Sequence, residues 1–258
     1  MYPRPMGFIR MVLRYTLGVL WTAACFSVRV LIWPSTWFSG PLDRRMRRAI
    51  IRFWGRGFAP IIGMKVVVAG PLPEPPFYLV ANHLSYLDVW VLDYTLGCAF
   101  VARGDMQHWP IIGPMSKALH VLFIDRENKR DAVRVNELIA HTLQQGDGIA
   151  VFAESRISRG LDVEPFKSAL IQPAILNSMP VHFATISYES KPGGPPASRT
   201  VGWWRPEPFF FHLSRLLRQR HGFTATIVFG EEPIASTDRK LLAQQLYEAV
   251  RANYVPMK

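Results

Sequence analysis

Beyond residue 60, short runs of β-branched and aromatic residues alternate with amphipathic stretches. Strands are expected over residues 65–69, 77–81, 99–102, 120–124, 148–152, 180–187, 199–203 and 223–229. Helices are expected over residues 85–95, 112–119, 129–145, 168–177, 208–220 and 236–253. This alternation predicts an α/β fold in which helices cover a mostly parallel sheet.

A longer apolar pattern precedes these elements. The stretch from Tyr15 to Val28 carries no charge over fourteen residues, and basic residues lie on both sides of it. At about 1.5 Å per residue it covers only about two thirds of a hydrocarbon core of roughly 30 Å, and a spanning helix has its positive flank mainly on one side. We therefore expect helices over residues 8–33 and 41–58 that form a membrane-docking hairpin in one leaflet. The tryptophans expected at headgroup depth are Trp21, Trp33, Trp37 and Trp54.

Two other interpretations of this segment stay open. A signal peptide has the same order of positive and apolar regions, but the apolar segment continues beyond the nearest cleavage pattern, Ala23-Ala24-Cys25. A helix hairpin inside a protein core would also hide the apolar residues. Cys25 and Cys98 are too few for a disulfide framework, which favours a reducing compartment and hence the cytoplasmic face of the cell membrane.

The positive charge is concentrated near the start of the chain. The net charge is +11, and residues 1–65 hold eleven basic residues and one acid, Asp43. Such a segment indicates an anionic partner, either a membrane or a nucleic acid. Because the arginines accompany a continuous apolar segment, we expect membrane lipids and no nucleic acid. We divide the chain into membrane-docking helices at residues 1–60 and one globular domain at residues 61–258.

Candidate chemistry follows the expected strand at residues 77–81. Ligands of open α/β sheets bind beyond the carboxyl ends of strands, where His83 falls. Ser85 and Asp88 fit a capping box at the start of the next helix, so the bend brings His83 and Asp88 together. A carboxylate on one imidazole nitrogen leaves the other free to take a proton from a substrate hydroxyl. The alternative is a turn histidine beside a helix-capping aspartate.

Other catalytic arrangements find no support in the sequence. The seven histidines are scattered without ligand spacing, so no metal site is expected. The chain also has no Gly-x-Ser-x-Gly elbow for a serine nucleophile. Direct attack by a bound alcohol is the simpler chemistry.

Several ordered motifs resemble those of the glycerolipid acyltransferases, the group that includes the 1-acylglycerol-3-phosphate acyltransferases. Asn82-His83-x4-Asp88 resembles the first signature block of that family, and Phe123-Ile124-Asp125-Arg126 resembles the second. The stretch from Phe152 to Ser158 resembles a variant of the third block. Pro165-Phe166-Lys167-Ser168 and Met179-Pro180-Val181 resemble the segments that come next. The likeness covers roughly residues 75–190 and implies a glycerol-3-phosphate acyltransferase-like fold.

The resemblance implies transfer of a fatty acyl group from a thioester on coenzyme A or acyl carrier protein to the hydroxyl of a lysolipid such as 1-acylglycerol-3-phosphate. No cofactor beyond this co-substrate is implied. His83 would be the general base and Asp88 its partner, while Arg126 and Glu154 would help to hold the acceptor's polar head. The charge of Arg156 would suit a different anionic head, or would simply be solvated. Without the resemblance, Arg126 is more readily explained as a surface ion pair and Glu154 as a capping acid.

The third block departs from the family pattern. Ala153 replaces the usual proline, and Ser155 and Arg156 stand where the family has glycine and threonine. Glycine permits a positive φ that serine tolerates poorly, so this departure bears on the acceptor geometry. Residues 164–170, with Trp203-Trp204 downstream, resemble the branch that includes the lyso-ornithine lipid acyltransferases, and a lyso-ornithine lipid is the second candidate acceptor.

A catalytically silent lipid-binding protein of the same fold is a further alternative. The altered third block favours it, whereas the intact His83 and Asp88 argue against it.

Overall fold

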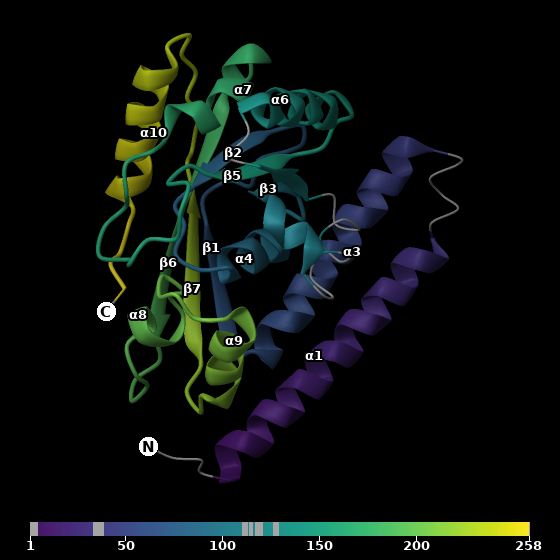
Figure 1. The fold of residues 1–258 in the computed structure, drawn as a ribbon, viewed down its shortest axis with the longest axis vertical. Helices are drawn as coiled ribbons and strands as arrows, with labels where there is room; N and C mark the ends of the chain where they lie inside the picture. Colours follow the sequence, from purple (N-terminus) through teal and green to yellow (C-terminus); the bar gives the residue numbers. More distant parts are fainter. Residues whose placement is uncertain are drawn as a thin grey trace.

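The computed structural model describes residues 5–32, 39–109, 113, 116, 121–125 and 129–257. Its centre is a seven-stranded sheet of strand order β1-β7-β6-β2-β5-β3-β4 (Figure 1). The strands are β1 (Met64–Ala69), β2 (Tyr78–Ala81), β3 (Ala99–Arg103), β4 (Leu122–Ile124), β5 (Ile149–Phe152), β6 (Val181–Ser190) and β7 (Phe223–Phe229). Every neighbouring pair in the sheet is parallel except β6 and β7. The mostly parallel sheet that the sequence predicts is confirmed.

Helices cover both faces of the sheet. They are α1 (Pro5–Leu31), α3 (Gly40–Ile61), α4 (Leu87–Thr95), α6 (Lys129–Gln144), α7 (Gln172–Leu176), α8 (Ala197–Thr200), α9 (Phe209–Arg218) and α10 (Arg239–Ala252), with 3-10 turns η1 (Gly104–His108) and η2 (Ser168–Leu170). Strand β2 is fully buried, as a central parallel strand should be. Leu79 and Ala81 pack on the side of α3, α4 and α9, whereas Tyr78 and Val80 pack on the side of α6, α7 and α10.

Two of the expected elements differ from those observed. Residues 199–203 form no strand, because the chain turns after Pro196 into the short helix α8 and Val201 donates its N–H to Ala197. The single helix expected over residues 168–177 is divided into η2 and α7, where Pro173 lies in the first turn of the second helix and has no N–H to continue the first. The helix expected over residues 112–119 falls almost wholly outside the described residues.

Helices α1 and α3 form the expected hairpin, with α1 on the outside of the molecule (Figure 1). Trp21 donates its indole N–H to the carbonyl of Trp54 at 2.9 Å, and Trp54 donates to the hydroxyl of Thr22 at 3.0 Å. Both indole N–H groups are therefore used inside the hairpin, and the expected headgroup contacts stay a prediction. Trp33 and Trp37 lie outside the described residues.

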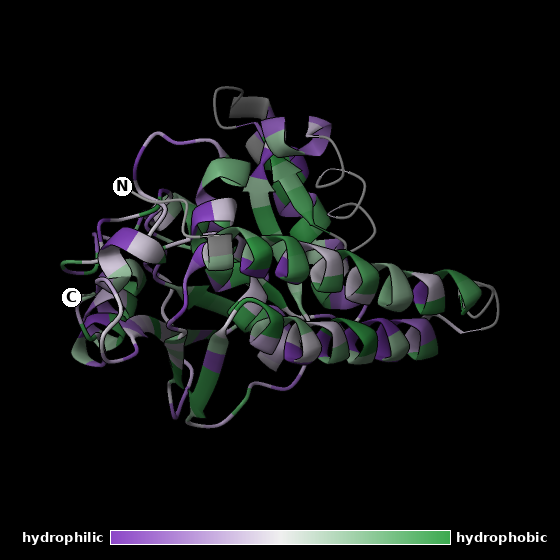
Figure 2. Cartoon of the chain, turned by 90° about the horizontal axis from the view of Figure 1, so that it is seen from below, coloured by the Kyte–Doolittle hydropathy of each residue, from purple (hydrophilic) through white to green (hydrophobic). Residues whose placement is uncertain are grey.

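Helix α1 is close in length to the helix expected over residues 8–33. The helix has 27 residues, about 40 Å at 1.5 Å per residue, so it extends well beyond the uncharged stretch. By length and hydropathy Met6–Leu31 could cross a membrane, although core helices and signal sequences pass the same test. Length and hydropathy therefore do not exclude a span, and the placement of this helix in one leaflet stays a prediction. Figure 2 shows α1 as mostly hydrophobic and α3 as richer in hydrophilic residues.

Much of the positive charge near the start of the chain has partners within the protein. Arg47 is 2% exposed and forms a buried ion pair with Asp147. Arg29 pairs with Asp43 at 3.1 Å. Arg14 donates to two carbonyls at the end of α9, where basic side chains complement the helix dipole. Some of the excess positive charge at residues 1–65 therefore stabilises the packing of the hairpin and is not available at the surface.

Candidate active site

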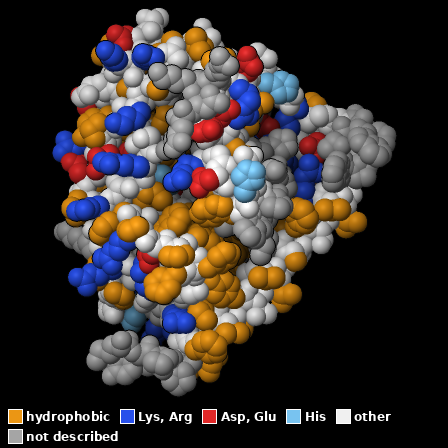
Figure 3. Space-filling model, in the orientation of Figure 1, with side chains coloured by type: hydrophobic (Ala, Val, Ile, Leu, Met, Phe, Trp, Pro, Cys, Tyr) orange, Lys and Arg blue, Asp and Glu red, His pale blue; other side chains and the backbone are white. Residues whose placement is uncertain are grey.

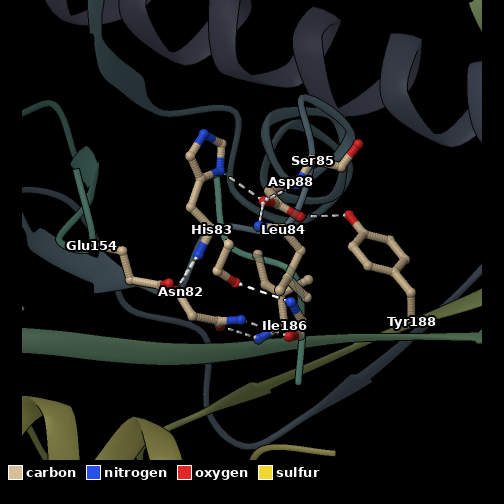
Figure 4. A network of polar contacts seen from close by, with 10 residues as sticks. Asn82, His83, Leu84, Ser85, Asp88, Glu154, Ile186 and Tyr188 are labelled. Carbon is tan, nitrogen blue, oxygen red and sulfur yellow. Dashed lines mark hydrogen bonds and ion pairs between the residues drawn. The ribbon is translucent and has the colours of Figure 1, made fainter. Parts of the chain in front are cut away.

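The site begins where β2 ends. Asn82 follows the strand and is completely buried. Its amide nitrogen donates to the carbonyl of Ile186 at 2.9 Å, and its oxygen accepts the N–H of Ile186 at 2.8 Å (Figure 4). This pair of bonds to β6 holds the chain in place immediately before His83. Asn82 is therefore a positioning residue, a role that the sequence does not reveal because Ile186 lies far along the chain.

The bend after β2 brings His83 and Asp88 together, as the sequence predicts. His83 Nδ1 lies 2.8 Å from Asp88 Oδ2, and the same carboxyl oxygen accepts the N–H groups of Leu84 at 2.7 Å and Ser85 at 2.9 Å. Asp88 is completely buried. These three contacts fix the position of the Asp88 side chain, which in turn holds the imidazole in one orientation. The catalytic roles of the two residues stay a prediction.

Half of the expected capping box is present. Helix α4 begins at Leu87, and the Asp88 carboxylate in its first turn accepts the Ser85 N–H. The Ser85 hydroxyl is buried and makes no hydrogen bond to any residue that the structure describes. The prediction that this hydroxyl caps the helix was therefore wrong. A negative charge in the first turn still suits the positive end of the helix dipole.

A second partner of Asp88 comes from β6. Tyr188 donates its hydroxyl to Asp88 Oδ1 at 2.7 Å (Figure 4). Burial and the neighbouring carboxylate raise the pKa of Tyr188 well above its ordinary value, so the phenol keeps its proton and remains a donor. Sequence reasoning missed this residue. The alternation of β6, which places Ile186 and Tyr188 on one face, was the signal that could have suggested it.

Among the residues that the structure describes, none forms a hydrogen bond with Nε2 of His83. The ring stacks on Phe152 with a centroid separation of 4.1 Å and an interplanar angle of 12°. Its side chain is 17% exposed, and Nε2 points away from Asp88 (Figure 4). Because the Asp88 carboxylate only accepts hydrogen bonds, the pairing assigns the proton of neutral His83 to Nδ1. Nε2 is then free to accept a proton from a bound hydroxyl.

Glu154 contacts the turn of residues 82–86 between β2 and α4, which carries the candidate base His83 and which we name the catalytic turn. One carboxyl oxygen accepts the His83 N–H at 2.7 Å, and the other accepts the Glu164 N–H at 3.2 Å. Burial raises the pKa of Glu154 to about 8, although the two N–H donors act in the opposite direction. These contacts position the main chain of His83. The expectation that Glu154 binds the acceptor stays a prediction.

The loop after Glu154 contains a residue with a positive φ at the position where the family has glycine. Ser155 adopts a φ of 61°, the left-handed region that glycine would occupy more easily. The N–H of Ser158 donates to the His83 carbonyl at 2.8 Å, which ties the loop to the site. Arg156 is largely exposed and pairs with Glu164 at 3.3 Å. Arg126 lies outside the described residues.

Within the part of the chain that the structure describes, no three His, Cys, Asp or Glu side chains are grouped to hold a metal ion. The arrangement around His83 is suited to accepting a proton from a bound group and returning it. It consists of an oriented imidazole, whose Nε2 has no partner in the described part of the chain, beside a buried carboxylate that can stabilise an imidazolium.

The candidate site lies inside the region that a protein-family model matches. A family model described as Acyltransferase matches residues 64–189, which include His83, Asp88 and Glu154. The 1-acyl-sn-glycerol-3-phosphate acyltransferase of Neisseria meningitidis serogroup B is 34% identical over 156 residues, covering 60% of this chain and 61% of that enzyme. The lyso-ornithine lipid O-acyltransferase of Rhodobacter capsulatus is 31% identical over 199 residues, covering 74% of this chain and 71% of that enzyme.

A solved structure has the same architecture. The crystal structure of the 1-acyl-sn-glycerophosphate acyltransferase of Thermotoga maritima matches with a TM-score of 0.67 and 18% sequence identity, over 95% of this chain and 92% of that chain. At this identity the likeness shows the fold. The sequence relatives carry the assignment further, and the chain belongs to the glycerolipid acyltransferase family that contains the 1-acylglycerol-3-phosphate and lyso-ornithine lipid enzymes.

Proposed function

We propose that the protein is a membrane-associated O-acyltransferase that moves a fatty acyl group from an acyl thioester to the hydroxyl of a lysolipid. The observation that carries this proposal is the His83–Asp88 pair at 2.8 Å, with Nε2 of His83 facing away from the carboxylate. The family supplies the reaction type, and this pair supplies the base that the reaction needs.

In the proposed mechanism, Nε2 of His83 removes the proton from the acceptor hydroxyl as its oxygen attacks the thioester carbonyl. The tetrahedral intermediate then collapses, the carbon–sulfur bond breaks, and the thiolate leaves and takes the proton back from the imidazolium. The products are the acylated lipid and the free thiol of the carrier. Asp88 contributes most while the imidazolium exists, because its negative charge is buried beside the ring.

Two acceptors fit this chemistry, since each has a free hydroxyl. The first is 1-acylglycerol-3-phosphate, which the name of the Neisseria relative indicates. The second is a lyso-ornithine lipid, which the Rhodobacter relative acts on by name. The ion pair between Arg156 and Glu164 favours the second, because an ornithine head carries a carboxylate and an ammonium that could pair with these two side chains.

The outer face of α1 supports membrane association. Its exposed apolar side chains are Met6, Phe8, Ile9, Val12, Leu13, Leu17, Val19, Leu20, Phe26, Val28, Val30 and Leu31. An apolar face of this size on a monomer marks an interaction surface, and a lipid substrate makes a bilayer the natural partner. We place this face in the cytoplasmic leaflet of the cell membrane, with coenzyme A or acyl carrier protein approaching from the aqueous side.

The test uses the purified full chain, vesicles that contain either lysolipid, and either acyl-coenzyme A or acyl carrier protein as donor. Mass spectrometry of the lipids identifies the product and therefore the acceptor and donor. We expect acylation of one lysolipid by the wild-type protein. Absence of product in all four combinations would refute the activity and favour a silent lipid-binding protein.

A further inference from the structure

Helix α9 has two unlike faces. Its inner face is buried in the domain through His212, Leu213, Leu216 and Leu217. On its outer face, Phe210 is 52% exposed and Phe211 is 63% exposed. Two adjacent phenylalanine rings in water are costly for a soluble domain, because each leaves a large apolar area in contact with solvent. Packing within the described part of the chain therefore does not explain why Phe210 and Phe211 are exposed.

The exposed face of α9 continues the apolar face of α1. The hydroxyls of Tyr15 and Ser214 lie 3.0 Å apart, and Arg10 donates to the carbonyl of Arg218 at 3.1 Å, so the two helices lie side by side. Phe210 precedes Ser214 by one helical turn and thus lies on the side of α9 that meets α1. Hydrophobic side chains gather over the lower part of the molecule, where Figure 1 places α9 and α1 (Figure 3).

Exposed basic residues flank α9 in the sequence. Arg218, at the end of α9, contacts Met11 of α1, while Arg205 and Arg220 lie just before and just after the helix. In the described part of the chain, none of the three forms an ion pair with an acid. Arginines at the edge of an apolar surface attract the anionic headgroups of a bilayer while their stems remain beside apolar neighbours. A bilayer with anionic lipids matches both features of this surface, the apolar centre and the basic edge.

The inner face of α9 is fastened to the catalytic turn. His212 Nδ1 lies 2.9 Å from the hydroxyl of Tyr86, and the Phe209 ring contacts the Tyr86 ring at a centroid separation of 4.7 Å. Tyr86 immediately precedes α4, two residues before Asp88. Binding of the outer face of α9 to another surface would therefore also hold the start of α4, and the nearby His83, at a fixed position relative to that surface.

We propose that α9 is a second lipid-docking element, in which Phe210 and Phe211 enter the same leaflet as α1 and hold the site of His83 at the bilayer surface. The proposal rests on the proposed function in that the bilayer also supplies the substrate. It extends the membrane-docking surface beyond residues 1–60 into the globular domain. It also gives His212 and Tyr86 a role as the link between the docked helix and the catalytic turn.

The binding test uses the full chain with Phe210→Cys labelled by an environment-sensitive fluorophore. Leu241→Cys on α10 is the matched control, because Leu241 is also 52% exposed. The natural cysteines, Cys25 and Cys98, are buried, and the unmodified chain measures any label that they take up. Vesicles of phosphatidylethanolamine and phosphatidylglycerol are added, with lipids brominated at a known depth as quenchers.

We expect a blue shift and quenching of the label at position 210, and neither change at position 241. A label at position 210 that stays in water on fully bound protein would overturn the proposal. A shift that needs no vesicles and accompanies a doubling of the particle mass would also overturn it, since a second copy would then cover α9.

A second measurement separates docking from catalysis. Phe210→Asp combined with Phe211→Asp should lower the acylation rate of a vesicle-embedded lysolipid by about tenfold or more, because charged side chains oppose insertion. The rate with a short-chain lysolipid dissolved as monomers should stay within about twofold of the wild-type rate. Equal losses with both substrates would refute a docking role. If the wild-type protein acylated neither substrate, the proposed function would fail while the fluorescence result still decided the docking.

Discussion

Replacing Asp88 by asparagine isolates the contribution of a single negative charge. Asparagine can place its oxygen where Oδ2 lies, which keeps the N–H groups of Leu84 and Ser85 and the Nδ1–H of His83 bonded. Its amide nitrogen then faces the Tyr188 hydroxyl, which can accept a hydrogen bond. The fold and the orientation of the imidazole should therefore survive, whereas the stabilisation of the imidazolium should not.

The magnitude follows from the geometry. The His83 and Asp88 atoms are 2.8 Å apart, and the centres of the two charges are about 4 Å apart. At an effective dielectric constant of about 20, a charge pair at this separation is worth roughly 4 kcal/mol, which corresponds to a roughly thousandfold loss of kcat. Steady-state kinetics on lysolipid vesicles, with unfolding in urea as a check of the fold, measure both effects. A loss of less than about tenfold in a stably folded variant would show that the charge does not support the base.

Three further changes test the surroundings of the pair. Tyr188→Phe removes the donor to Asp88 Oδ1, and urea unfolding should show a loss of about 1.5 to 3 kcal/mol; an unchanged midpoint would contradict this contact. Ser155→Gly removes the strain of a positive φ at a non-glycine residue and should raise the free energy of unfolding by up to about 1 kcal/mol. Ser178→Gly is the control, because Ser178 also has a positive φ but lies outside the site. A lower free energy of unfolding for Ser155→Gly would show that the serine side chain contributes more than the strain costs. Because the folded protein holds the Glu154 proton up to about pH 8, whereas the ordinary value is 4.5, the folded state binds more protons in this window and the free energy of unfolding should fall as pH rises through it. Glu154→Gln should remove that fall, and an identical pH profile in wild type and variant would contradict the raised pKa.

The parts of the site that the sequence predicts are the local ones. His83 and Asp88 are five positions apart, and a strand followed by a helix start is enough to bring them together. The partners that hold this pair in place are distant in the chain. Tyr188 and Ile186 reach the site through the pairing of β2 with β6, which a single sequence does not specify. Side-chain contacts across the sheet therefore had to come from the structure.

The N-terminal hairpin shows the same division. Apolar periodicity predicted two helices over residues 8–33 and 41–58, and α1 and α3 lie close to these bounds. Composition treated every arginine as a surface charge, whereas Arg47 is buried against Asp147 and Arg14 bonds to the end of α9. The sequence showed an excess of charge, and only the packing shows which charges remain available to a membrane.

The central claim is that the imidazole of His83 removes the proton from the acceptor hydroxyl. The most direct test is acyl transfer by purified His83→Ala, measured on lysolipid vesicles beside the wild-type protein. The Asp88 carboxylate keeps its bonds to Leu84, Ser85 and Tyr188 in this variant, so the fold should persist. We expect no product above the uncatalysed background. A rate equal to that of the wild type would contradict the account and remove His83 from the mechanism.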